Sequence, residues 1–117
     1  MDSLPYHTPV LEFDIPIYGG RVYCFTSLEA YNSFRTHVGC DPLDSPSAGY
    51  CTQYRNTVTG SVIYSLMVSD SRPSTLVHEL GHLTHQILAH VGIKDEEAFC
   101  YLLDFLFREC GGDANLD

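Results

Sequence analysis

Residues 73–91 read PSTLVHELGHLTHQILAHV, the longest run with helical periodicity in this 117-residue chain. Its large apolar residues recur every three or four positions, which places them on one face of an α-helix. They are Leu76, Leu80, Leu83, Ile87 and Val91. Pro73 suits the first turn of a helix, and Gly92 suits the position just after its last turn. The stretch therefore predicts an amphipathic helix with one face against a core.

The opposite face of this helix carries the pattern HExxH, as His78-Glu79-Leu80-Gly81-His82. Two histidines four residues apart lie one turn apart on the same helix face, so their imidazoles can converge on one metal ion. Glu79 is rotated by roughly 100° from His78, where its carboxylate can bond a water instead of the metal. The pattern predicts a Zn²⁺ site held by His78 and His82, with Glu79 as general base.

A further helix is predicted after the short connection 92–94, because Asp95 is a suitable N-cap and Gly111-Gly112 is a suitable end. Apolar residues occupy much of the segment 99–107. So short a connection favours antiparallel packing of the two helices. The start of this helix is therefore expected near the end of the helix that carries HExxH.

A zinc site needs a third protein ligand, and the acidic residues Asp95, Glu96 and Glu97 are the first candidates. Glu97 shares a polar stripe with Asp104 and Arg108 that is also compatible with a solvated surface, whereas Glu96 borders the apolar side of the helix. Helical phase alone does not select one of them.

The segment His78 to His82, followed by Glu97-Ala98-Phe99-Cys100-Tyr101, resembles the gluzincin branch of zinc peptidases, especially minimal gluzincins and small peptidases of phages. In that family, a glutamate that begins the next helix is the third ligand. The resemblance implies His78, His82 and Glu97 as zinc ligands and Glu79 as the catalytic base. It also implies a zincin-like fold that hydrolyses a peptide or protein substrate, bound in an extended form along an edge strand.

The sequence offers several other side chains as candidates for supporting roles around the proposed zinc site. Larger gluzincins have an aspartate where this chain has Tyr101, and Asp104 is the candidate to replace it. His85 lies about 10 Å along the helix axis from His78, too far for one ion to bind all three histidines. We interpret it as a cleft or surface histidine. Tyr64, Tyr101 and Arg108 are possible oxyanion donors, but the sequence assigns that role to none of them.

Upstream of the HExxH helix, two segments have the pattern of β-hairpins. Residues 10–25 begin with alternating apolar and polar positions, contain Gly19-Gly20 as a turn, and include Pro16, which favours an edge strand. Residues 50–55 and 61–68 flank a turn at 56–60. The sheet is expected to be antiparallel or mixed.

Between the hairpins, Thr26 and Glu29 match a capping box, and apolar residues at helical spacing then continue to Gly39. A short helix is therefore expected here. The fold class predicted for residues 1–117 is α+β: a single zincin-like domain with a twisted sheet from two hairpins, an active-site helix and a glutamate-bearing C-terminal helix.

Composition and net charge disfavour some kinds of partner and location for this protein. A net charge of −9 and a pI near 4.8 disfavour nucleic acid as a partner. No segment predicts a membrane span or a signal peptide, and the five cysteines lack CxxC spacing, so we expect a cytoplasmic protein with free thiols. The alternative to a peptidase is a zincin scaffold without proteolysis, which binds zinc for stability or binds a partner protein. The intact Glu79 favours the enzyme.

Overall fold

The computed structural model describes residues 9–44 and 47–111, and this part of the chain forms four strands and three helices. The strands are β1 (Leu11–Asp14), β2 (Arg21–Phe25), β3 (Gly49–Arg55) and β4 (Val62–Val68). The helices are α1 (Leu28–His37), α2 (Pro73–Val91) and α3 (Glu96–Glu109). The predicted α+β class, with two hairpins and a helix between them, is confirmed.

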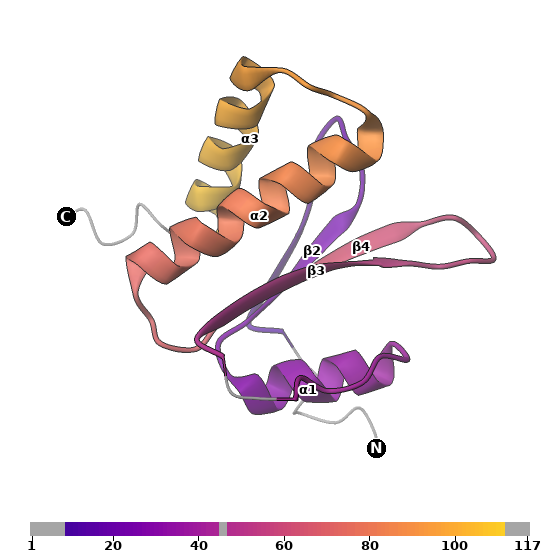
Figure 1. The fold of residues 1–117 in the computed structure, drawn as a ribbon, viewed down its shortest axis with the longest axis vertical. Coiled ribbons are helices and arrows are strands. Elements are labelled where there is room, and N and C mark those ends of the chain that lie inside the picture. The colour runs from indigo at the N-terminus through magenta and orange to yellow at the C-terminus, as the bar shows by residue number, and fades with distance from the viewer. Residues whose placement is uncertain (1–8, 45–46, 112–117) are drawn as a thin grey trace.

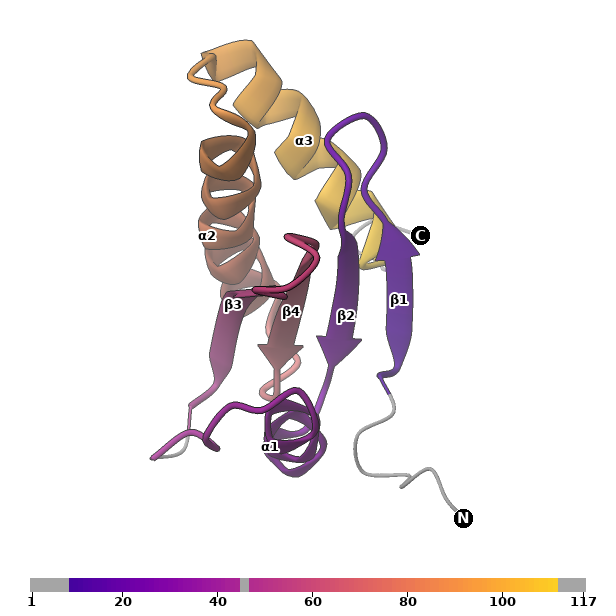
Figure 2. The same ribbon diagram turned by 90° about the vertical axis from the view of Figure 1, so that its right-hand side faces the viewer.

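The strands form one mixed sheet in the order β1-β2-β4-β3 (Figure 2). Both hairpins are antiparallel, and they meet through β2 and β4, which pair in parallel with Val22 opposite Tyr64. This order leaves β1 at one edge of the sheet, as Pro16 predicts, and β3 at the other.

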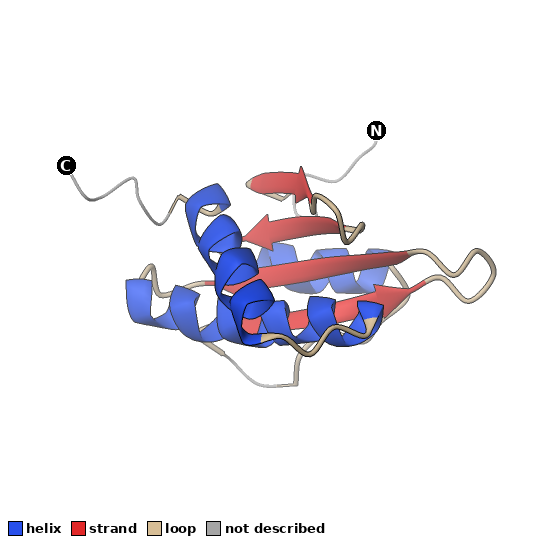
Figure 3. Ribbon diagram, turned by 90° about the horizontal axis from the view of Figure 1, so that it is seen from above, coloured by secondary structure: helices blue, strands red, loops and turns tan. Residues whose placement is uncertain are grey.

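Helices cover both faces of the sheet, with α1 on one side and α2 and α3 on the other (Figures 1 and 3). Alternation along β2 supplies both cores, because Val22 and Cys24 pack toward α2 and α3, whereas Phe25 packs toward α1. The apolar stripe of α2 is buried as predicted at Leu80, Leu83 and Ile87. Because that stripe packs against the sheet, the opposite face of α2, which carries His78 and His82, is exposed.

Two sequence predictions about local structure are wrong. Helix α1 is capped by Ser27 and not by Thr26: Ser27 has an extended backbone, and its Oγ accepts a hydrogen bond from the Ala30 N–H at 3.1 Å. The alternation in residues 10–25 gives Ile17 the same parity as Phe13 and Ile15 and so predicts that it faces the core with them. Ile17 is instead 95% exposed with φ 71°, because the chain has already entered its turn there. Serine caps a helix as well as threonine does, and the turn lies ahead of the Gly19-Gly20 pair expected to mark it.

Helix α2 ends at Gly92, which has φ 76° and donates its N–H to the Ala89 carbonyl. The Ile93 N–H bonds to the Leu88 carbonyl at 2.9 Å, and the chain then turns back to begin α3. Asp95 caps α3 as predicted, with its Oδ2 accepting from the Ala98 N–H at 2.8 Å. None of the helices in the described ranges has both the length and the apolar character needed to cross a membrane.

Candidate metal centre

His78 and His82 lie one turn apart on the exposed face of α2, and their rings approach each other closely. The ring centroids are 4.7 Å apart, with an angle of 84° between the ring planes. The two Nε2 atoms are 3.2 Å apart, so both imidazoles direct the same nitrogen toward one point.

This separation matches what a zinc ion requires of two neighbouring ligands. With Zn–N bonds of about 2.0–2.1 Å, two vertices of a tetrahedron lie roughly 3.3 Å apart. The two imidazoles share a hydrogen bond of 3.2 Å between their Nε2 atoms. Both histidines are exposed residues. The donor set thus fits a zinc ion without a change in the histidine rotamers.

Glu79 lies on the adjacent, inner side of α2 and is only 8% exposed. Its side chain rests against the first residue of the edge strand β3: a Cβ added at Gly49 would lie 2.9 Å from both Cγ and Oε2 of Glu79. The same added atom would lie 2.8 Å from Cγ2 of Thr75. The absence of a side chain at Gly49 is therefore what admits the Glu79 carboxylate between α2 and β3.

Cys51, two residues further along β3, is a second contact of Glu79. Its thiol donates to the backbone carbonyl of Glu79 at 3.5 Å. Burial, and then the charge of the Glu79 carboxylate and hydrogen bonding to it, raises the pKa of Cys51 to about 12. The thiol therefore stays neutral at physiological pH and adds no second negative charge beside Glu79.

The candidates for the third ligand begin α3, where they differ in their surroundings. The Asp95 carboxylate is engaged as the helix cap. Asp95 and Glu96 line a hollow of about 500 Å³ between α2 and α3, together with His85. Glu97 is exposed in the first turn of α3 and is not among the residues lining that hollow.

The histidine pair and the α3 carboxylates are not brought together into one cluster. Across residues 9–44 and 47–111, no group of three or more His, Cys, Asp or Glu side chains is arranged to hold a metal ion. The two histidines lie side by side, and the metal site of His78, His82 and Glu97 stays a prediction.

The remaining candidates are dispersed over the fold. Tyr64 is 1% exposed, and its hydroxyl accepts a hydrogen bond from Gln53 Nε2 at 3.3 Å. Tyr101 is 71% exposed, and Arg108 is paired with Asp104 on the surface of α3. His85 is exposed one turn beyond His82. None of these groups is directed to the histidine pair by a contact in the described part of the chain.

The sequence did not identify two residues that contact Glu79, namely Gly49 and Cys51. The pattern of residues 50–55 predicts a strand but contains no signal for the helix against which that strand packs. Their role becomes visible only when β3 forms the edge of the sheet beneath α2. Comparisons with models of protein families, with curated proteins and with solved structures give no match for this chain.

Proposed function

We propose that this chain is a zinc-dependent peptidase with a gluzincin-type site on a zincin-like fold. The observation that carries the proposal is the geometry of α2, where His78 and His82 direct two Nε2 atoms 3.2 Å apart toward one point while Glu79 flanks them. Glu97 is the proposed third ligand, on the basis of its place in the motif. A purely structural zinc site would have no use for a base at position 79.

The position of the edge strand supports a peptide as the substrate. In the described ranges, β3 pairs with β4 on one side only, which leaves its outer main-chain groups available to an extended chain. Glu79 lies against the first residue of this same strand, so a peptide paired with β3 would pass close to the carboxylate. Main-chain pairing of this kind aligns a substrate without a deep pocket.

The proposed reaction needs a proton carrier and a group that polarises the scissile carbonyl. Zinc, bound by His78, His82 and Glu97, would polarise the carbonyl and lower the pKa of a bound water toward about 7. Glu79 takes a proton from the attacking water and passes it to the leaving nitrogen. Its position between α2 and β3 restricts the carboxylate, and the neutral Cys51 thiol helps to hold that part of the helix.

Glu79→Gln tests the proposal, because glutamine keeps the shape and hydrogen bonding of the side chain but cannot act as a base. Wild type and variant would be loaded with zinc and incubated with a diverse peptide pool, and new termini would be identified by mass spectrometry. We expect the variant to keep its zinc and to lose activity by about 10²- to 10⁴-fold. Glu29→Gln is the matched control, since Glu29 is exposed on α1, on the opposite face of the sheet.

Cleavage that persists undiminished in Glu79→Gln would refute the mechanism. Zinc lost together with activity would assign Glu79 a structural role. If zinc-loaded wild type cleaves nothing in a broad pool, the peptidase proposal fails, and a zinc-binding interaction domain becomes the better account of the same histidine pair.

A further inference from the structure

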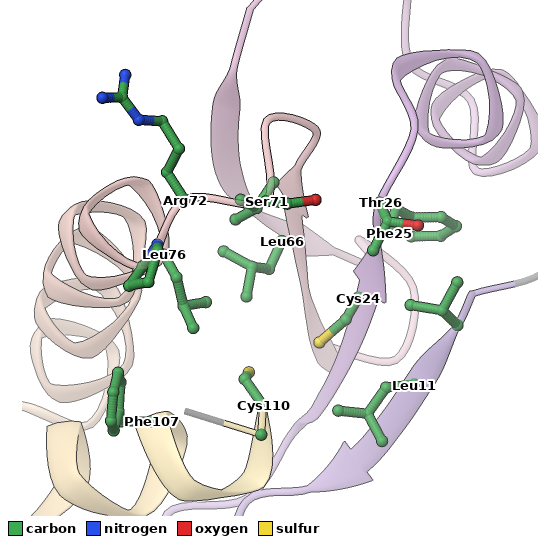
Figure 4. Close-up of a pocket in the computed structure, with 14 residues that line it drawn as sticks. Leu11, Cys24, Phe25, Thr26, Leu66, Ser71, Arg72, Leu76, Phe107 and Cys110 are labelled. Atoms are coloured by element: carbon green, nitrogen blue, oxygen red, sulfur yellow. The ribbon is translucent and has the colours of Figure 1, made fainter. Parts of the chain in front are cut away.

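A second hollow lies at the opposite end of the α2 face, away from the histidines. It has a volume of about 290 Å³ and is bounded by the ends of β2 and β4, the start of α2 and the end of α3 (Figure 4). Its lining is mainly apolar, with Leu66, Leu76 and Phe107 directed inward. The hollow is therefore separate from the surface that carries His78 and His82.

Two cysteines from distant parts of the sequence face each other in this hollow. Cys24 lies on β2, and Cys110 is the C-cap residue of α3. Figure 4 shows the Cys24 sulfur pointing toward the end of α3, where the Cys110 side chain points back. Both cysteines line the same hollow, and they lie close enough together that each changes the pKa of the other.

The other three cysteines lack such a thiol neighbour in the part of the chain that the structure describes. Cys51 contacts Glu79 on β3, Cys100 is exposed on α3, and Cys40 follows α1 on the other side of the sheet. The structure has all five cysteines as free thiols. Only the pair in the hollow is therefore arranged for an intramolecular reaction.

The two thiols are chemically unequal. The neighbouring Cys110 thiol, and then burial, raises the pKa of Cys24. The neighbouring Cys24 thiol lowers the pKa of Cys110. A thiolate is the attacking species in thiol–disulfide exchange, so Cys110 is suited to react first and Cys24 to react second.

We propose that Cys24 and Cys110 are a redox modification site, at which a low-molecular-weight disulfide oxidises the pair reversibly to an intramolecular disulfide. The Cys110 thiolate attacks one sulfur of that disulfide, which forms a mixed disulfide and expels one thiolate. Cys24 then attacks the Cys110 sulfur, and its proton passes to the second departing thiolate. One small disulfide is reduced to two thiols, and the two protein thiols become one protein disulfide.

The oxidised form would connect β2 directly to the last turn of α3. In the reduced form, α3 is held at this end by apolar contacts with the core that contains Cys24. The covalent link closes a long loop, which restricts the unfolded chain and stabilises the fold. It also removes both thiols from the lining of the hollow. The proposal does not depend on zinc binding or on peptide hydrolysis.

The test uses the whole chain, which is reduced and freed of reductant before excess oxidised glutathione is added. We expect peptide mapping to identify a Cys24–Cys110 crosslink that dithiothreitol reverses, and the thermal midpoint to rise by about 5–15 °C. Cys100→Ala, which removes an exposed thiol from the same helix, should form the same crosslink with the same shift.

Cys24→Ala should stop at a glutathione adduct on Cys110, because the second thiol is missing. If Cys24→Ala does not fold, peptide mapping of the oxidised wild-type protein still shows whether Cys24 and Cys110 become linked. Oxidation that leaves Cys24 and Cys110 unlinked, joins either to another cysteine, or links them only after the protein is unfolded in urea would overturn the proposal.

Discussion

The two faces of the sheet differ in the size of their cores and in how their polar groups are used: the larger core lies under α2 and α3, and the smaller, mainly aromatic one lies under α1. On the α1 face, the buried Tyr31 hydroxyl bonds to Ser65 Oγ at 2.7 Å, and Ser65 Oγ bonds to the Tyr54 hydroxyl at 2.9 Å. The ring of Phe25 packs on Tyr31 at a centroid distance of 5.6 Å, and the ring of Phe34 packs on Tyr54 at 5.8 Å. Each of these polar groups is satisfied from within the protein.

The α2 and α3 face has a different organisation. It has two hollows, an exposed histidine pair, a buried carboxylate at Glu79 and two facing thiols. The two thiols line one of these hollows, whereas the histidine pair and Glu79 line neither, and the α1 face is closed by aromatic rings. We expect α1 to serve mainly stability and the face with α2 and α3 to carry the proposed chemistry. On this account, a substitution in the core under α1 should lower stability and leave zinc affinity unchanged, whereas substitutions on the opposite face should change zinc affinity or turnover.

Phe34→Ala should give the largest change in stability. Phe34 is 6% exposed and contacts the rings of Tyr23, Phe25 and Tyr54, so its truncation leaves a cavity. We expect the free energy of unfolding to fall by about 3–5 kcal/mol, while zinc affinity of the folded protein is unchanged. Urea denaturation and zinc titration measure the two quantities. Val58→Ala, at a 90% exposed position, should change stability by less than about 0.5 kcal/mol. A large loss of zinc affinity in Phe34→Ala would show that the faces are coupled.

Glu97→Ala should weaken zinc binding without a comparable loss of stability, because Glu97 is exposed in the first turn of α3. Removing a group that only hydrogen-bonds to a metal ligand lowers metal affinity by roughly 10- to 100-fold. Because Glu97 is proposed as a direct ligand, its loss should lower zinc affinity by at least as much. Glu96→Ala, at the neighbouring position, is the matched control and should change affinity little. Competition with a chelator ranks the two variants. The reverse order would transfer the third ligand to Glu96, which borders the hollow between α2 and α3.

Gly49→Ala should have a smaller effect on stability but a specific effect on the base. The added Cβ would overlap Thr75 and Glu79, at 2.8–2.9 Å, so Glu79 must shift. We expect a cost of about 1–3 kcal/mol in stability and a fall in kcat at unchanged zinc content. Gly81→Ala is the stability control, because its Cβ would meet no atom within 4 Å and the helix should gain about 0.5–1 kcal/mol. If stability and turnover are unchanged in Gly49→Ala, the proposal that β3 restricts the position of the Glu79 carboxylate is wrong.

The sequence predicted the elements of this fold better than their arrangement. Helical spacing from Leu76 to Ile87 and the punctuation by Pro73 and Gly92 correctly predicted α2, because these signals are local. The parallel pairing of β2 with β4 depends on contacts between distant segments, and no local pattern encodes it. The same limit explains why spacing within α2 identified the histidine pair, whereas Gly49 and Cys51 went unnoticed. The facing thiols are a stronger case, since Cys24 and Cys110 lie near opposite ends of the described chain.

Zinc binding to purified wild type, His78→Ala and His85→Ala tests the central claim most directly. Elemental analysis and competition with a chelator would measure zinc content and affinity of all three. We expect wild type and His85→Ala to hold close to one zinc per chain, since His85 lies beyond the converging pair. His78→Ala should lose the ion, because a site without one of the paired Nε2 atoms holds zinc weakly. A full complement of zinc in His78→Ala at wild-type affinity would contradict the proposed site.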